Sequence, residues 1–219
     1  MNPIFQHPSY LLKRQAIALA GKFRFYDPMG NLVMFSEQKM FKWREDIRVY
    51  ADENKTQEVL SIKARQIMDF SAAYDVVDTA LNQKVGALRR KGLRSILRDE
   101  WEVLDANDNV KGLLFEDSMG LALLRRFLLG SWLPQNYDIT FGETRVADLK
   151  QNFNLFRYEL NLDFTMDAGH LLDRRLGIAG AQAEHDCHVL DVPALAQDEH
   201  ARHCPDRTLR VIDPVGRIS

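Results

Sequence analysis

The chain has 219 residues, 46% of them hydrophobic, and a formal net charge of -2. This length allows one large domain or two small ones, and the composition can supply a sizeable core. The near-neutral balance excludes a protein that is basic over its whole surface, so any anion site must be local. Two cysteines are too few for a disulfide framework, which fits a reducing compartment.

The N-terminal residues show neither a signal peptide nor a membrane anchor. Residues 1–15 contain Pro3, Pro8, Lys13 and Arg14 and lack an apolar core, and residues 1–9 read as a loose arm. No later stretch approaches the roughly 18 apolar residues of a membrane span. We therefore expect a cytoplasmic location, with any membrane contact peripheral. Residues 10–20 are compatible with a strand or a helical turn.

A short motif then recurs, in which an aromatic residue opens a strand and an Asp closes it before a turn and a Gly. The copies are residues 23–27 with Gly30, 74–78 with Gly86, and 101–105 with Gly112. Each copy predicts a hairpin, with returning strands at 32–35, 85–88 and 110–115. The recurrence favours an internal repeat over chance similarity among hairpins. Asp27, Asp78 and Asp105 are expected to cap turns rather than to form a catalytic carboxylate cluster.

Two further strand pairs are predicted at residues 47–50 with 59–67 and at 137–140 with 144–147. One helix is predicted between them, from Asp117 or Ser118 to Gly130, because Leu121 and Leu124 begin an apolar stripe. We interpret it as plugging or flanking the sheet.

The C-terminal part begins with residues 156–164, which alternate between apolar and polar side chains and predict a strand. An apolar stripe of Leu172, Leu176 and Ala179, with Leu171 and Ile178 beside it, then predicts a helix over residues 171–181. Residues 182–219 contain no aromatic residue and have weak periodicity, which indicates a polar tail that is poorly ordered or atypical.

The segment 23–30, the copy at 101–105 and the final strand-to-helix stretch together resemble the LURP-one-related family, which belongs with phospholipid scramblases and tubby C-terminal domains. The resemblance covers about residues 10–181. It implies a mainly β fold, a closed tubby-like barrel of about twelve strands around a central C-terminal helix. The family's helix is long and strongly apolar, whereas residues 182–186 are polar here. Either the helix is shortened, or the reading frame has shifted near Ala181.

The most concentrated positive charge lies in one short run. It comprises Arg89, Arg90, Lys91, Arg94 and Arg98. In a compact loop these groups would converge on a phosphate, which Arg binds in bidentate fashion. The resemblance adds that tubby domains bind phosphoinositide headgroups and that scramblases act at membranes. The alternative is a solvated hairpin loop.

A second cluster comprises Lys39, Lys42, Trp43 and Arg44. Basic residues interleaved with aromatic ones suit a lipid surface or a nucleic-acid base. We favour the simpler interpretation, in which the aromatic side chains face the core and the charges face water.

The sequence offers little chemistry for catalysis or for a metal. It contains no Gly-rich phosphate loop, no Gly-x-Ser-x-Gly elbow and no His-Glu-x-x-His. The tail holds His185, Cys187 and His188, and then His200, His203 and Cys204, but their spacing matches no established zinc module. We therefore expect no enzyme activity, no cofactor and no metal.

The sequence thus predicts a binding module that recognises anionic phospholipid headgroups or a protein partner at a membrane surface. Scrambling itself would need a membrane-spanning segment. Two alternatives remain open. The barrel would bind a small apolar ligand if the short helix leaves a cavity. A nucleic-acid or transcription-linked role has been proposed for tubby-like proteins, although the net charge argues against it.

Overall fold

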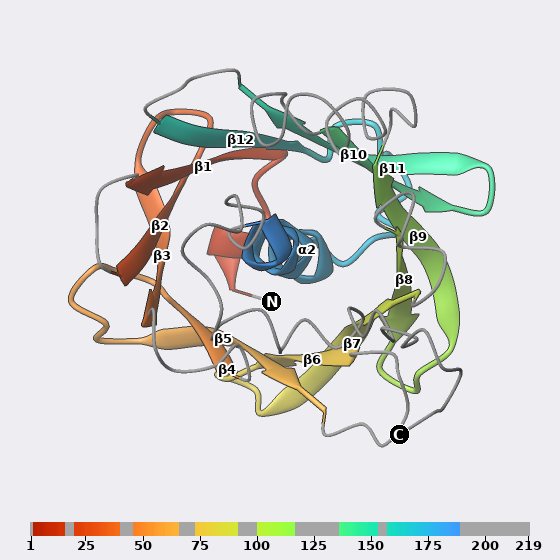
Figure 1. The fold of residues 1–219 in the computed structure, drawn as a ribbon, viewed down its shortest axis with the longest axis horizontal. Coiled ribbons are helices and arrows are strands. Elements are labelled where there is room, and N and C mark those ends of the chain that lie inside the picture. Colours follow the sequence, from red (N-terminus) through yellow and green to blue (C-terminus); the bar gives the residue numbers. More distant parts are fainter. Residues whose placement is uncertain are drawn as a thin grey trace, which may run out of the picture.

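In the computed structural model, the described residues form a barrel of twelve antiparallel strands around one helix (Figure 1). The structure describes residues 2–15, 20–39, 46–65, 73–91, 100–116, 136–152 and 157–188. The elements are η1 (Pro3–Phe5), β1 (Ser9–Gln15), β2 (Ala20–Tyr26), β3 (Leu32–Lys39), β4 (Asp46–Tyr50), β5 (Glu58–Ala64), β6 (Ala73–Asp78), β7 (Gln83–Arg90), β8 (Glu100–Asp105), β9 (Val110–Glu116), β10 (Asn136–Phe141), β11 (Thr144–Gln151), β12 (Arg157–Asp163) and α2 (Arg174–His188). The predicted fold class is confirmed. The predicted helix at 117–130 and the tail beyond residue 188 lie outside the described residues.

Each strand pairs with its neighbours in the sequence, and β1 closes the barrel by pairing with β12. Ser9 lies opposite Asp163, and the register continues without a shift to Gln15 opposite Arg157. Closure leaves no strand edge unpaired, which removes the edge-to-edge association that threatens open sheets.

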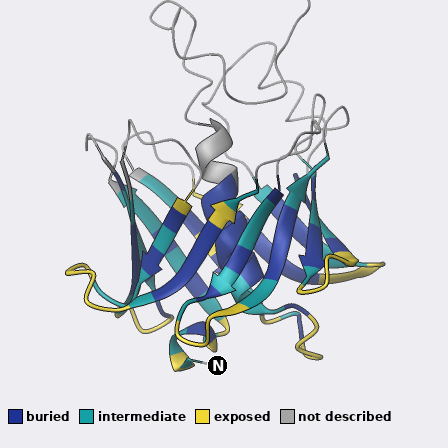
Figure 2. Cartoon of the chain, turned by 90° about the horizontal axis from the view of Figure 1, so that it is seen from below, coloured by how far each residue is buried: buried dark blue, intermediate teal, exposed yellow. Residues whose placement is uncertain are grey.

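The barrel has two ends with different connections. The hairpin end carries the turns at residues 27–31, 51–57, 79–82, 106–109 and 142–143. The opposite end, here called the loop end, is where β1, β3, β5, β7, β9 and β11 finish and the next strands begin. Figure 2 shows many exposed residues at the turns of the hairpin end. The helix α2 runs from the hairpin end towards the loop end.

The recurring motif corresponds to a recurring hairpin geometry. The carboxylate of Asp27 accepts hydrogen bonds from the backbone N–H groups of Met29 and Asn31, at 2.9 and 2.8 Å. Asp105 accepts the same pair from the residues two and four positions later, both at 2.9 Å. Every copy also has a β-bulge ahead of its Asp, between Phe25 and Tyr26, Val76 and Val77, and Val103 and Leu104. The predicted turn capping is confirmed. The three copies share a bulged hairpin whose strand ends in a turn-capping Asp.

The N-terminal segment is not the loose arm that the sequence suggests. Phe5, in η1, is buried, and the Tyr10 hydroxyl donates a hydrogen bond to the Ile4 carbonyl at 2.7 Å. Burial raises the pKa of Tyr10 to about 12. The segment is held because an aromatic side chain in the core and a satisfied hydroxyl anchor it together.

The start of α2 differs from the prediction. The helix begins at Arg174, where the Asp173 carboxylate accepts the backbone N–H of Arg175 at 3.1 Å. Leu171 is 56% exposed and precedes the helix, so the predicted helix start at residue 171 is wrong. The reason is Asp167, whose carboxylate accepts the N–H groups of Leu171 and of the next residue, both at 2.9 Å, and holds them in a turn.

The predicted end of the helix at Ala181 is also wrong, because α2 continues to His188. Gln182 is 0% exposed and Ala183 is 4% exposed, so both still lie inside the molecule. A polar residue was expected to leave the core. Instead, the barrel interior itself becomes polar near the loop end.

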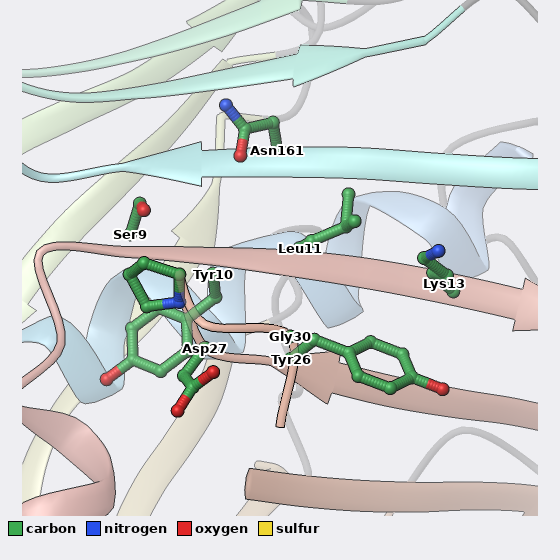
Figure 3. A pocket seen from close by; sticks show the side chains of 9 residues that line it. Ser9, Tyr10, Leu11, Lys13, Tyr26, Asp27, Gly30 and Asn161 are labelled. Carbon is green, nitrogen blue, oxygen red and sulfur yellow. The ribbon is translucent and has the colours of Figure 1, made fainter. Parts of the chain in front are cut away.

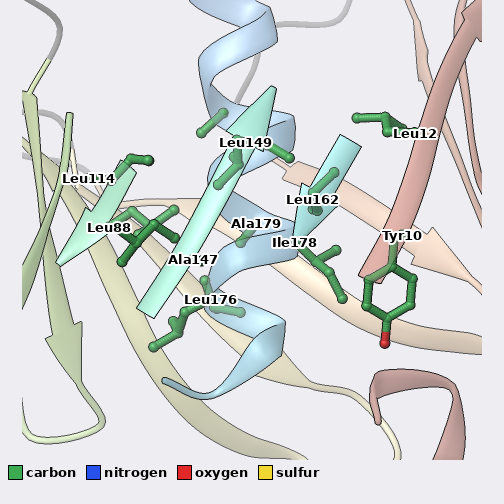
Figure 4. Packing of buried hydrophobic residues seen from close by; sticks show 14 of the residues in the cluster. Tyr10, Leu12, Leu88, Leu114, Ala147, Leu149, Leu162, Leu176, Ile178 and Ala179 are labelled. Atoms are coloured by element: carbon green, nitrogen blue, oxygen red, sulfur yellow. The ribbon is translucent and has the colours of Figure 1, made fainter. Parts of the chain in front are cut away.

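Small residues allow α2 to fit inside the barrel. A Cβ atom on Gly177 would lie 2.5 Å from a ring carbon of Phe164, and one on Gly180 would lie 3.1 Å from Leu114. A side chain on Gly177 would therefore have to displace the Phe164 ring, and one on Gly180 would make a tight contact with Leu114. The helix packs most closely against β6, β7 and β12. Figure 4 shows how Leu88, Leu114, Leu149 and Leu162 surround it. In this part of the barrel, packed side chains occupy the place where an apolar-ligand cavity was the alternative expectation.

Candidate functional site

The predicted basic run is divided between the two faces of the barrel wall. A Cβ atom on Gly86 would lie 3.1 Å from Leu176 of α2, which identifies the inner face of β7. Side chains alternate along a strand, so Arg90 also faces inward, whereas Arg89 and Lys91 face outward. Among the described cations of this run, Arg90 therefore lies on a different face of the wall from Arg89 and Lys91.

The two outward cations pair with carboxylates on β8. Arg89 Nε lies 2.7 Å from Oε2 of Glu102, and Lys91 Nζ lies 2.6 Å from Oε1 of Glu100. Both cations remain partly exposed. Exposed ion pairs of this kind contribute about 0–1 kcal/mol, so either cation can exchange its partner at little cost.

Several predicted site residues lie outside the described residues. These are Arg94, Arg98, Lys42, Trp43, Arg44 and the side chain of Lys39. The strands that flank them are described. β3 finishes and β4 begins at the loop end. In the same way, β7 finishes and β8 begins at that end. The fold thus brings the flanks of both basic clusters to the same end of the barrel.

The inner wall becomes polar at the loop end. On four strands, an inward-facing leucine is followed two positions later by a polar residue: Leu12 by Arg14, Leu88 by Arg90, Leu114 by Glu116, and Leu149 by Gln151. Trp101 lies opposite Arg90 and contacts Tyr74, with 5.8 Å between ring centroids. We call these inward polar and aromatic residues the inner rim. Sequence reasoning missed it, although alternating apolar series that end in a polar residue are visible in the sequence.

The three recurring aspartates do not converge. Asp27 and Asp105 cap separate turns, as described above. Asp78 accepts the backbone N–H of Leu81 at 3.0 Å with one carboxylate oxygen. Its other oxygen lies 2.6 Å from Nη1 of Arg175 on α2. Each carboxylate has a structural role, as expected from the sequence.

An open groove of about 430 Å³ crosses the outer face of β1 near the hairpin end. Figure 3 shows Lys13 and Leu11 along β1, with Asn161 on β12 to one side and Tyr26 on β2 to the other. The ammonium group of Lys13 lies 3.5 Å from a carboxylate oxygen of Glu159 and 5.5 Å from the Tyr26 ring centroid. The groove therefore presents a cation that is already neutralised, away from the predicted basic clusters.

The described residues place no group of three or more His, Cys, Asp or Glu side chains where they would hold a metal ion. The side chains of the tail's His and Cys motifs lie outside the described part. Among the helices that the structure describes, none has both the length and the hydropathy that a membrane crossing needs.

Comparison with known proteins gives one family match. The model of the LURP-one-related family matches residues 32–183. A solved X-ray structure of an Arabidopsis thaliana protein is similar to this chain, with 13% sequence identity and a TM-score of 0.45, over 85% of this chain and 95% of that one. No curated protein matches.

Proposed function

The chain belongs to the LURP-one-related family, and we propose that it is a non-enzymatic module that binds an anionic phospholipid headgroup at a membrane surface. The binding surface is the loop end of the barrel. If lipid does not bind, the alternative is that this surface binds a protein partner.

One observation carries the proposal. The strand ends that flank the two basic clusters, β3 with β4 and β7 with β8, lie at the same end of the barrel. Basic side chains gathered at one end can meet a flat anionic surface together, whereas a ring of cations around the barrel wall cannot. Attraction to an anionic membrane is about 1 kcal/mol for each basic residue close to the surface.

The local charge supports the same end. Between residues 89 and 102, the sequence holds five basic and three acidic residues, on a chain with a net charge of -2. Glu100 and Glu102 pair with Lys91 and Arg89. Arg90, Arg94 and Arg98 then remain against Asp99. Because Arg90 faces inward, Arg94 and Arg98 are the residues to test.

The experiment is co-sedimentation with vesicles, comparing neutral lipid with lipid that contains a phosphoinositide, at low and at physiological salt. The test variant is Arg94→Gln/Arg98→Gln. We expect wild type to bind only anionic vesicles and less at higher salt, because the attraction is screened. Losing two contacts of about 1 kcal/mol each should weaken binding about thirtyfold.

The matched control is Lys55→Gln/Lys111→Gln, which removes the same charge from the hairpin end. It should bind vesicles like wild type. Equal losses in both variants would show an effect of net charge alone, and folded wild type that ignores anionic vesicles would reject lipid binding and point to a protein partner.

A further inference from the structure

The groove on the outer face of β1 has an apolar floor. Tyr10 and Leu12 of β1 are buried in the core, so Leu11 between them points outward. Leu11 lies opposite Tyr26 of β2. Figure 3 shows the Tyr26 ring extending along β2 towards Lys13. Leu11 and this ring together give a ligand an aliphatic and aromatic surface to cover.

Neutral polar side chains surround this floor. Asn161 of β12 lies opposite Leu11 on the other side, and Ser9 lies two residues before Leu11 on β1. The Asn161 amide, the Ser9 hydroxyl and the Tyr26 hydroxyl have no hydrogen-bond partner in the part of the chain that the structure describes. Each of these groups can both donate and accept a hydrogen bond. The groove therefore offers mixed hydrogen bonding without charge.

The charged groups of the groove already have partners. The Lys13 ammonium group lies 3.5 Å from a carboxylate oxygen of Glu159 and 5.5 Å from the Tyr26 ring centroid. The Asp27 carboxylate accepts the backbone N–H of Asn31 at 2.8 Å and its side-chain N–H at 3.0 Å. A charged ligand must compete with these contacts, whereas a neutral ligand leaves them intact.

The groove is preformed and has the size of a small-molecule site. Its volume of about 430 Å³ lies within the range of about 300–1,000 Å³ that such sites occupy. Pro28 and Gly30 line it from the turn that the Asp27 carboxylate holds together. The other lining residues lie on paired strands of the closed barrel. A rigid site of this kind loses little conformational freedom when a ligand binds.

We propose that this groove is a binding site for a neutral saccharide. A sugar ring has a face of C–H groups that can cover Leu11 and the Tyr26 ring. Its hydroxyl groups both donate and accept hydrogen bonds, as the Asn161, Ser9 and Tyr26 side chains do. A purely apolar ligand leaves these side chains unpaired, and an ionic ligand meets charges that are already compensated.

The test is a binding titration of the full chain by saturation-transfer NMR. The neutral probes are cellotriose, maltotriose and triacetylchitotriose, and the charged comparators are the cationic glucosamine trimer and the anionic galacturonate trimer. We expect a neutral trisaccharide to bind more tightly than both charged ones. Its affinity should be the same at low and at physiological salt, because no charge pairs with the ligand.

The test variant is Tyr26→Phe/Asn161→Leu, which removes two hydrogen-bonding groups and keeps the ring and the side-chain size. It should weaken saccharide binding about tenfold or more. The matched control is Tyr50→Phe/Asn107→Leu, which removes the same groups from β4 and from an exposed turn outside the groove. This control should bind saccharide like wild type.

Three results overturn the proposal. In the first, folded wild type binds none of the neutral trisaccharides. In the second, the groove variant, folded by circular dichroism, binds as wild type does or loses no more affinity than the control. In the third, the affinity falls steeply with salt, which shows that the ligand is recognised by its charge.

A further arm separates a free sugar from a unit of a longer glycan. A methyl glycoside that binds as tightly as its trisaccharide assigns a single sugar, and an affinity that rises with chain length assigns a glycan. The groove lies near the hairpin end, away from the proposed membrane surface. Arg94→Gln/Arg98→Gln should therefore keep saccharide binding, and Tyr26→Phe/Asn161→Leu should keep vesicle binding, so either proposal can fail without the other.

Discussion

At the turns of the hairpin end, single carboxylates organise several backbone N–H groups. Asp105 is the clearest case, because hydrogen bonds from the backbone and the side chain of Asn109 hold its pKa at about 2. Asp27 has a lowered pKa for the same reason, with the Asn31 side chain as its largest cause. Such a carboxylate stabilises the folded state only while it is ionised.

The first prediction concerns Asp105 and pH. Its pKa is about 2 in the folded chain and about 3.9 in an unfolded one, so its stabilising effect is present above about pH 4 and is lost as the pH falls towards 2. Asp105→Asn should be less stable than wild type at pH 7, and the gap should narrow between about pH 4 and 2. Urea unfolding followed by circular dichroism at several pH values measures this. Glu143→Gln, at an exposed turn position of the same end, is the control for losing one carboxylate. If the difference in unfolding free energy between wild type and Asp105→Asn stays constant with pH, the charge of Asp105 does not contribute to the stability of the turn.

At the scale of the elements, an ion pair and close backbone approach both hold α2 in the barrel. Arg175 on α2 reaches Asp78 at the end of β6, and both side chains are largely buried. Five residues further along the helix, Gly180 lies against Leu114. The helix therefore fits the barrel because Gly177 and Gly180 allow its backbone to approach the wall, while Leu176 and Ile178 fill the core.

The second prediction concerns whether replacing a glycine of α2 by alanine raises or lowers the free energy of unfolding. Alanine normally stabilises a helix by about 1 kcal/mol relative to glycine. At Gly177, however, the new methyl group would lie 2.5 Å from the Phe164 ring. We expect Gly177→Ala to destabilise the protein by about 1–3 kcal/mol in urea unfolding, because overpacking outweighs propensity. Gly169→Ala, where the nearest side-chain atom lies 3.5 Å away, is the control and should change stability by less than about 0.5 kcal/mol. Stabilisation by Gly177→Ala would mean that the helix sits less deeply in the barrel.

At the scale of the whole molecule, the barrel and its helix depend on each other. The inward leucines of the barrel wall are buried only if something fills the interior. Ile178, Ala179 and Ala181 of α2 fill it, and each is 0% exposed. The described core ends at Ala183. Residues 189–219 lie outside the described residues, and the family match ends at residue 183.

The third prediction compares two truncations. A chain that ends at residue 188 keeps α2, and its free energy of unfolding in urea should equal that of the full chain within about 1 kcal/mol. A chain that ends at residue 173 lacks the helix and should show no cooperative transition, because the inward leucines lose the surface that buries them. Unfolding monitored by near-ultraviolet circular dichroism distinguishes the two. Failure of the longer chain to fold would give residues 189–219 a role in the barrel.

The sequence by itself determined most of the strands and their turns, although it left β1 open between a strand and a helical turn. Two kinds of signal act over only a few residues, so they can be recognised in the sequence alone. They are the alternation at residues 23–27 and 101–105 and the turn capping by Asp27 and Asp105. The apolar pattern of residues 171–181 predicted the helix, and the family resemblance supplied the number of strands and the closed barrel around it. The helix boundaries did not follow, since Asp167 holds Leu171 in a turn despite its apolar side chain.

Only the tertiary structure decided which polar residues lie inside. Strand register pairs Arg89 with Glu102 and turns Arg90 inward, and neither partner is close to the other in the sequence. Gln182 was assigned to a polar tail, yet it is buried because α2 continues into the part of the barrel where the wall is polar. Burial depends on what the chain places opposite a residue, and closing the barrel brings together side chains that the linear pattern keeps far apart.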